Sequence, residues 1–280
     1  MGDRRSLARS SVMGMRINRR IINSIIHLDG MDCRVAFCEL TPMNRPYITA
    51  VLAMTADGKI SDHQRSPFRL GSPADKLHLE ARIAEADATL FGSGTLRAYQ
   101  TTLRITQPDY LAWRVSQEKP PQPIHIVCSH AGHFDPHWPF FAQPVPRWLL
   151  TSNPHLTHWP RDFPGSFEKV ILCQATPGLK MWPSPQIPWA LALNQLRQLG
   201  IEKLTVLGGG NLVSTFVENH FLDELWLTIC PFLVGGEKAP SLMAGQGLPL
   251  NAAKTLQLNA VKTVEQEVFL HYLCRKDENR

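Results

Sequence analysis

Short apolar runs alternate with segments that are apolar on one helical face along most of the chain. The apolar runs predict buried strands at 47–54, 88–92, 124–129, 147–151, 169–173, 203–207 and 223–231. The one-sided segments predict helices at 72–86, 188–199 and 211–220. Two further runs, 254–261 and 264–274, predict an antiparallel strand pair at the C-terminus. This alternation predicts an α/β fold with a mixed, mostly parallel central sheet flanked by helices.

Turn and loop residues support this division. Ser72-Pro73-Ala74-Asp75 is typical of a helix start, with serine as the cap, proline at the first helical position and an acid in the first turn. The stretches 99–123, 130–147 and 152–188 are rich in proline and polar residues and predict long surface loops.

The first 44 residues stand apart as a predicted N-terminal extension, and 45–280 form the predicted main domain. Isoleucines between 21 and 26 fit one helical stripe beside several arginines, which would suit a targeting or membrane-surface segment. We favour the alternative, a disordered extension or a start codon assigned too early, because ordered patterning begins directly after Met43.

Composition narrows the class of protein. Residues 1–42 hold seven arginines and four acids, +3 of the net charge of +5, so the body does not predict a nucleic-acid surface. No apolar stretch is long enough to span a bilayer. Cys128, Cys173 and Cys230 lie in or beside apolar runs and predict buried free thiols. We therefore expect a cytoplasmic protein with a small-molecule substrate and no nucleic-acid or membrane partner.

A glycine run follows the predicted strand 203–207. Gly208, Gly209 and Gly210 stand between this strand and a helix that begins near Asn211 and Leu212. Such a turn lets a pyrophosphate approach the backbone, and the helix adds unpaired N–H groups and the positive end of its dipole. The alternative is a tight turn without a ligand, since the run is not the Rossmann G-x-G-x-x-G.

Two other strand ends carry candidate chemistry. Strand 88–92 runs into Gly92-Ser93-Gly94-Thr95, where Thr95 and Arg97 could meet a phosphate or ribose. Strand 47–54 ends in small residues before Asp57-Gly58. There Ala53 would leave room for a flat ring, and Asp57 could orient a substrate or relay a proton. A simple turn aspartate remains the alternative for Asp57. Ligands of such sheets collect at the carboxyl ends of strands.

Several other kinds of site are not predicted. Four histidines crowd 125–137, but no pattern of carboxylates or cysteines accompanies them, so we predict no metal site. The G-x-S-x-G elbow of serine hydrolases and the P-loop lysine motif do not occur.

Over residues 45–274 these segments together resemble the C-terminal reductase domain of the bifunctional riboflavin-biosynthesis deaminase/reductase. The resemblance is carried, in order, by Arg45-Pro46-Tyr47, Met54-Thr55-Ala56-Asp57-Gly58-Lys59, Ala86-Asp87-Ala88, Gly92-Ser93-Gly94-Thr95, Gly208-Gly209-Gly210, Asp223-Glu224-Leu225, Pro231 and Gly235-Gly236. It implies a dihydrofolate-reductase-like fold, a homodimer, and NADPH-dependent reduction of the ribosyl group of 5-amino-6-(5-phosphoribosylamino)uracil. The zinc motifs of the deaminase half do not occur in the sequence.

The resemblance also implies cofactor contacts by position. Ala53 would lie at the nicotinamide side, Thr95 would contact the cofactor, and Ser129 would lie near the adenosine 2′-phosphate. Residues 209–215 would wrap the pyrophosphate. The predicted cofactor set is Ala53, Thr95, Ser129, Gly208, Gly209, Gly210, Asn211 and Leu212.

Departures from the family pattern lie mostly on the substrate side. Pro67-Phe68-Arg69 replaces a common Ser-x-Trp, Tyr99-Gln100-Thr101 replaces Asp-Asp-Pro, and Leu207 replaces a glutamate. The predicted substrate contacts are Lys59, Phe68, Arg69, Arg97 and Leu207, with the three cations as candidates for an anionic group. An NADPH-dependent reductase is thus the leading hypothesis. The alternatives are a reductase of the same fold acting on another heterocycle such as a pterin, and an NADP-binding sensor or scaffold without turnover.

Overall fold

The computed structural model describes residues 25–28, 31–34, 44–158, 166–174 and 187–275, which fall into the units Met1–Pro42 and Met43–Arg280. In the first unit, β1 (Ile25–Leu28) and β2 (Met31–Arg34) pair as antiparallel strands. The helical stripe considered as one alternative for 21–26 does not form in its described part, which is a strand, and the remainder lies outside the described residues. The alternative origins of the extension stay predictions.

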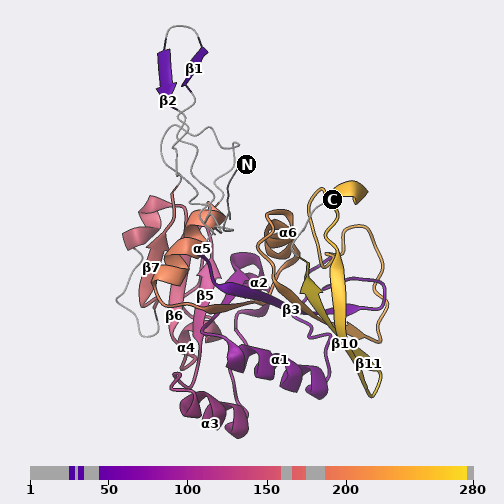
Figure 1. The fold of residues 1–280 in the computed structure, drawn as a ribbon. Coiled ribbons are helices and arrows are strands. Elements are labelled where there is room, and N and C mark those ends of the chain that lie inside the picture. The colour runs from indigo at the N-terminus through magenta and orange to yellow at the C-terminus, as the bar shows by residue number, and fades with distance from the viewer. Residues whose placement is uncertain (1–24, 29–30, 35–43, 159–165, 175–186, 276–280) are drawn as a thin grey trace, which may run out of the picture. The chain divides into compact units, whose positions relative to one another are not determined.

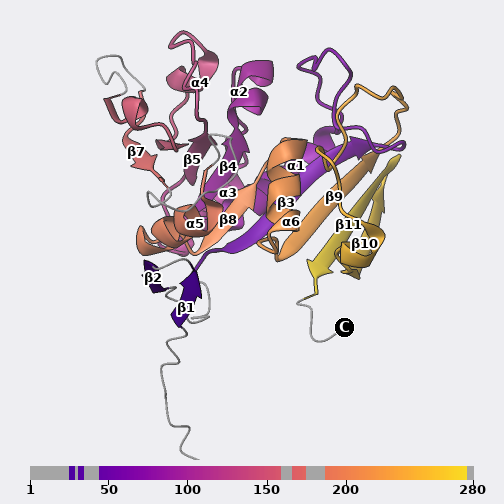
Figure 2. The ribbon, with the colours of Figure 1, turned by 90° about the horizontal axis from the view of Figure 1, so that it is seen from above.

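The second unit is built on a nine-stranded sheet in the order β10-β11-β9-β3-β8-β4-β5-β6-β7 (Figures 1 and 2). Its strands are β3 (Tyr47–Thr55), β4 (Ala88–Gly92), β5 (Ile124–Cys128), β6 (Arg147–Thr151), β7 (Lys169–Leu172), β8 (Lys203–Val206), β9 (Glu224–Cys230), β10 (Leu256–Val264) and β11 (Glu267–Cys274). Every pairing from β9 to β7 is parallel, and β11 runs antiparallel to both β9 and β10. The predicted architecture, a mostly parallel sheet with an antiparallel C-terminal pair, is confirmed.

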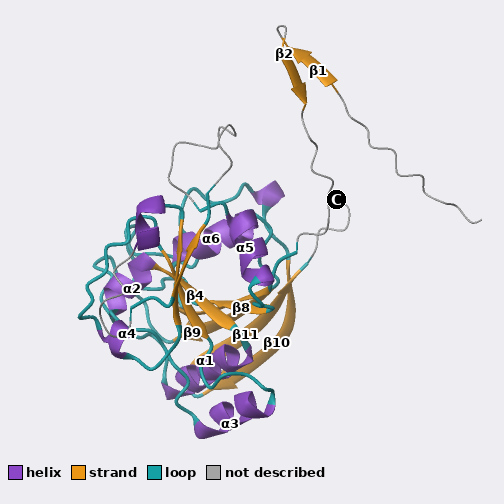
Figure 3. Cartoon of the chain, turned by 90° about the vertical axis from the view of Figure 1, so that its left-hand side faces the viewer, coloured by secondary structure: helices purple, strands orange, loops and turns teal. Residues whose placement is uncertain are grey.

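Helices cover both faces of this sheet. They are α1 (Pro73–Glu85), α2 (Ser93–Tyr99), α3 (Pro108–Ser116), α4 (Pro139–Ala142), α5 (Trp189–Gln198) and α6 (Gly210–Glu218), with short 3₁₀ segments at Pro154–His158 and Leu250–Ala252. Figure 3 shows α5 and α6 on one side of the sheet and α1 and α3 on the other. Successive side chains of a strand point to opposite faces of the sheet. In β4, Leu90 therefore packs in the hydrophobic cluster with α5 and α6, whereas Phe91 packs with α2 and α4.

The predicted long loops were partly wrong. The stretch 99–123 contains α3, and 130–147 contains α4. Helix α3 has a weak apolar face, because Trp113 and Val115 are exposed. It is anchored by polar contacts: the buried Glu80 on α1 accepts hydrogen bonds from the backbone of Thr106 and Gln107, just before α3 begins. Polar contacts of this kind do not require apolar residues at helical spacing, so hydrophobic periodicity does not reveal the helix.

The thiols follow the prediction. Cys173 and Cys230 are buried, Cys128 is half-buried, and all three are free. Burial raises the pKa of Cys128 and Cys230 to about 12. Within the part of the chain that the structure describes, no helix is both long and apolar enough to cross a bilayer.

Candidate active site

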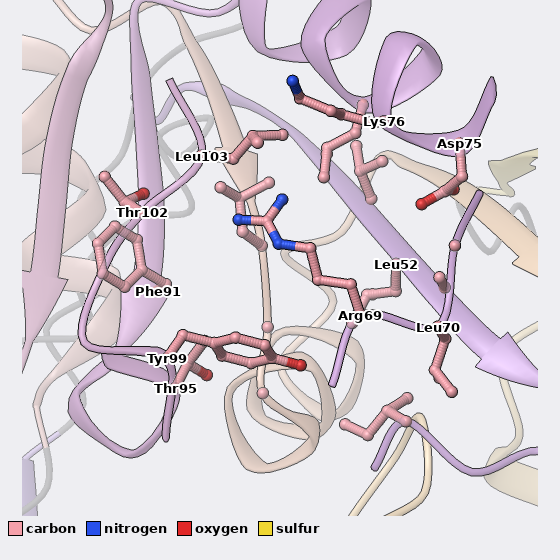
Figure 4. A pocket seen from close by; sticks show the side chains of 18 of the residues that line it. Leu52, Arg69, Leu70, Asp75, Lys76, Phe91, Thr95, Tyr99, Thr102 and Leu103 are labelled. Carbon is pink, nitrogen blue, oxygen red and sulfur yellow. The ribbon is translucent and has the colours of Figure 1, made fainter. Parts of the chain in front are cut away.

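A pocket of about 230 Å³ opens at the carboxyl ends of β3, β8 and β4 (Figure 4). The strand ends contribute Leu52, Ala53, Phe91 and the Leu207–Gly209 turn to its lining. Helix α1 and the segment after α2 close its sides, and most of its surface is apolar. Convergent strand ends of a parallel sheet are where α/β proteins bind ligands.

The two glycine-rich turns that the sequence singled out lie side by side. The Leu207 N–H donates to the carbonyl of Leu90 at 2.9 Å, and the Gly92 N–H donates to the carbonyl of Gly208 at 3.1 Å. A methyl group on Gly209 would lie 3.5 Å from the Thr95 hydroxyl. Helix α6 starts directly behind this junction, with Gly209 as its cap. Backbone and helix N-terminus together therefore face the pocket rim with few side-chain atoms in between.

The structure brings part of the predicted cofactor set together. Ala53, Thr95, Gly208 and Gly209 line the pocket. Gly210 and Leu212 are buried in the first turn of α6, while Asn211 is exposed on it. Ser129 lies apart from the pocket lining: it is buried, and its hydroxyl accepts a hydrogen bond from the Gly132 N–H at 3.0 Å.

Of the predicted substrate contacts, Arg69 and Leu207 line the pocket. Figure 4 shows the Arg69 side chain reaching into the pocket toward Leu103. Phe68 packs edge-on against Phe232 instead, and Lys59 donates to the carbonyl of Ala239 at 3.3 Å. Arg97 is exposed on the last turn of α2. The crowded histidines do not share one site, because His125 is buried against Thr102 while His130 bonds Ser152.

Asp57 also lies outside the pocket lining. Its carboxylate accepts hydrogen bonds from the Thr55 hydroxyl at 2.5 Å, the Gly235 N–H at 2.6 Å and the Val234 N–H at 3.2 Å. These bonds, that of Thr55 above all, lower the pKa of Asp57 to about 2. The observed contacts therefore fit a carboxylate that joins the turn after β3 to the loop after β9.

We expect Asp57→Asn to lower the melting temperature near neutral pH, because an amide presents a donor where the loop also presents donors. The folded-state pKa is depressed, so the stabilisation by the carboxylate is present above its unfolded pKa and is lost as pH falls through about 2. The difference in melting temperature between wild type and variant should therefore shrink in acid. Thermal denaturation across pH measures it, and a difference that grows in acid would contradict the assignment.

Sequence reasoning missed the acid that does line the pocket. Asp75 was predicted only as a first-turn residue of a helix, but it and Leu79 both face the cavity. The signal was available: Asp75, Leu79 and the buried Ile83 follow each other at i, i+4 spacing and so share one helical face. Burial in the apolar pocket raises the pKa of Asp75, and the charge of Glu267 raises it further. The Thr228 hydroxyl, hydrogen-bonded to Asp75, and the charge of Arg69 act in the opposite direction.

Comparison with known proteins assigns the chain to a family. The RibD C-terminal domain matches residues 46–270. A 2,5-diamino-6-ribosylamino-4(3H)-pyrimidinone 5′-phosphate reductase of Archaeoglobus fulgidus is 26% identical over 72% of this chain and 88% of its own. A protein of the same name from Methanothermobacter thermautotrophicus is 24% identical over 81% of this chain and 98% of its own. Riboflavin biosynthesis protein RibD of Bacillus amyloliquefaciens is 26% identical over 72% of this chain and 50% of its own.

Solved structures share the fold at low sequence identity. A pyrimidine reductase-like protein of Corynebacterium diphtheriae superposes with a TM-score of 0.66 at 17% identity, covering 84% of this chain and 94% of its own. The riboflavin biosynthesis reductase Rib7 of Saccharomyces cerevisiae gives a TM-score of 0.58 at 15% identity, covering 83% and 91%. The resemblance drawn from the sequence is thereby confirmed, and the chain belongs to the RibD C-terminal domain family.

Proposed function

We propose that the protein is an NADPH-dependent reductase of a 5-amino-6-ribosylaminopyrimidine 5′-phosphate. The observation that carries this proposal is the pocket where the two glycine-rich turns meet, with Arg69 and Lys76 at its polar side. The names of the relatives support a reductase of riboflavin biosynthesis. They do not favour the pterin reductase or the sensor considered above.

The residues at the strand ends fit a dinucleotide. No heavy atom lies within 4 Å of the place where a side chain on Gly92 or Gly94 would begin, so the turn after β4 leaves open space for a ligand. The first turn of α6 points its N–H groups toward the same edge and would hold the pyrophosphate. Ala53 would accept the flat nicotinamide, and Thr95 would hydrogen-bond the cofactor. When bound, NADPH would supply the hydride that reduces the ribosyl group.

The chain's own residues would then bind and orient the substrate. The apolar walls formed by Leu52, Leu79 and Leu103 exclude water from a flat heterocycle. Arg69 and Lys76 carry the positive charge that a sugar phosphate needs, although Lys76 also pairs with Glu80 at 3.4 Å. The Tyr99 hydroxyl donates to the carbonyl of Phe68 at 3.1 Å and thereby ties α2 to the segment that carries Arg69.

Titration of the purified protein with NADPH, with NADH in parallel, tests the cofactor. The activity is tested by following the absorbance of NADPH, which falls on oxidation. Either pyrimidine substrate is added, the 2,5-diamino-pyrimidinone phosphate or the 5-amino-uracil phosphate. We expect saturable binding of NADPH and its oxidation with at least one of the two substrates. Failure of the folded protein to bind NADPH would remove the proposal.

A homodimer and a cytoplasmic location stay predictions. Strand β10 lies at the edge of the sheet and exposes Leu256, Leu258 and Val261, a surface that suits self-association. Sedimentation of the purified protein would determine its oligomeric state.

A further inference from the structure

Asp75 is the pocket's acid, and its position in the first turn of α1 suggests a helix-capping role. The structure gives that role to another residue. Glu267 on β11 accepts the backbone N–H of Ser72 at 2.7 Å and its hydroxyl at 2.6 Å, and Ser72 in turn caps the N–H groups of Ala74 and Asp75. Because a distant glutamate completes the cap, the Asp75 carboxylate is available to the pocket.

The surroundings fix where this carboxylate lies. A methyl group on Gly71 would overlap the Asp75 side chain, so this side chain lies directly against the Gly71 backbone. On its other side Thr228, a buried residue of β9, shares a hydrogen bond with it. Thr228 pairs in register with Ala53, the residue expected beside the nicotinamide. Asp75 therefore stands at the inner wall of the pocket, and Figure 4 shows it on the α1 side of the cavity.

A carboxylate at the wall of an apolar pocket favours ligands that present hydrogen-bond donors to it. Ionised, it only accepts hydrogen bonds, and Thr228 uses one of its several lone pairs. The 2,5-diamino-pyrimidinone named for the archaeal relatives carries an amino group beside a ring N–H, which together form a donor pair for the two carboxylate oxygens. The corresponding uracil carries a carbonyl in place of that amino group, so one oxygen would face another across an apolar cavity.

We propose that Asp75 binds the donor edge of the pyrimidine and makes this chain selective for the 2-amino-pyrimidinone over the uracil. The inference rests on the proposed reductase function and deepens it by naming the substrate. It differs from the uracil expected from sequence resemblance.

The charged groups around Asp75 determine the pH range in which its carboxylate can accept hydrogen bonds from the pyrimidine. Glu267 from β11 and the Cys230 thiol from β9 lie on its buried side, while Arg69 and Lys76 lie toward the pocket. Since the pKa of Asp75 is raised, the ionised acceptor is lost at a higher pH than for an ordinary aspartate. The kcat/KM for the diamino substrate should fall as pH drops through this raised value, and Asp75→Asn should lack that decline.

The closing experiment compares kcat/KM for the two substrates in wild type, Asp75→Asn and Asp109→Asn. Asp109 is the matched control, an exposed acid in the first turn of α3, which like α1 begins with a proline. We expect wild type and Asp109→Asn to prefer the diamino substrate by at least about tenfold. Asp75→Asn should lower this ratio at least about tenfold, because an amide can accept from the ring N–H and donate to the uracil carbonyl. Its affinity for NADPH should stay within about twofold of wild type.

The outcomes separate the two proposals. NADPH oxidation with both substrates but without preference, or with preference for the uracil, overturns the selectivity and leaves the reductase function standing. Oxidation with neither substrate overturns both. An unchanged ratio in a folded Asp75→Asn protein that still binds NADPH overturns the role of Asp75. The wild-type ratio is measured on the unmodified chain, so a folding defect in the variant cannot hide a wrong prediction.

Discussion

Arg114→Met is expected to lower the free energy of unfolding by about 3–5 kcal/mol, a loss typical of broken buried polar networks. Arg114 is 1% exposed, which is rare for an arginine. Its guanidinium donates to the carbonyls of Ala84 and Ala86 at 2.7 Å each, and its Nε donates to the carbonyl of Pro120 at 2.6 Å. Methionine keeps the packing of the stem but leaves the buried carbonyls of Ala84 and Ala86 without these donors.

Urea denaturation measures the change, and Arg104→Met is the control. Arg104 is an exposed arginine on the same connecting segment between α2 and β5, so its replacement should stay within about 0.5 kcal/mol of wild type. A loss below about 1 kcal/mol for Arg114→Met would contradict the structural role assigned to the guanidinium. Because Arg114 holds α3 to the C-terminal end of α1, a helix that lines the pocket, we also expect a less stable pocket in the variant.

Arg114 also shows why helix α3 could not be predicted from the sequence. The strands carry runs such as Ala88-Thr89-Leu90-Phe91, buried on both faces, and hydrophobic periodicity therefore located them. Helix α3 is held through Arg114 and through Glu80, both buried side chains of residue types that usually mark a surface. A proline-rich stretch with an exposed tryptophan, Trp113, consequently resembled a loop. Long-range polar anchoring is set by partners distant in the chain, which no local pattern reveals.

Within the site, too, contacts with distant residues could not be predicted from the local sequence. The glycine turns could be located from the sequence because each glycine run stands between an apolar strand and a helix, and the structure places both turns together. The two aspartates could not be ranked from local sequence. Asp57 follows a strand as catalytic residues often do, yet backbone N–H groups of a distant loop occupy its carboxylate. Asp75 was predicted as an acid in the first turn of a helix capped by Ser72, and it is available to the pocket because Glu267 of the C-terminal hairpin binds Ser72 instead.

Gly210→Ala is expected to lower the free energy of unfolding by about 1–3 kcal/mol, the usual cost of overpacking. A methyl group there would lie 2.5 Å from the Ser241 carbonyl oxygen and 3.3 Å from the Ala244 side chain. The first of these is backbone, so either the loop or the start of α6 has to move. Since that turn of α6 is the proposed pyrophosphate site, the affinity for NADPH should fall as well.

Gly94→Ala is the matched control, because it places the same methyl group in α2 with no heavy atom within 4 Å. Alanine is the better helix former by up to about 1 kcal/mol, so this variant should melt at a higher temperature than wild type. If the open space beside Gly94 is where the cofactor lies, the more stable protein should nevertheless bind NADPH more weakly. Weaker binding in both variants, with opposite changes in stability, separates a ligand surface from a packing defect. Unchanged affinity in Gly94→Ala would exclude the turn after β4 from the cofactor site.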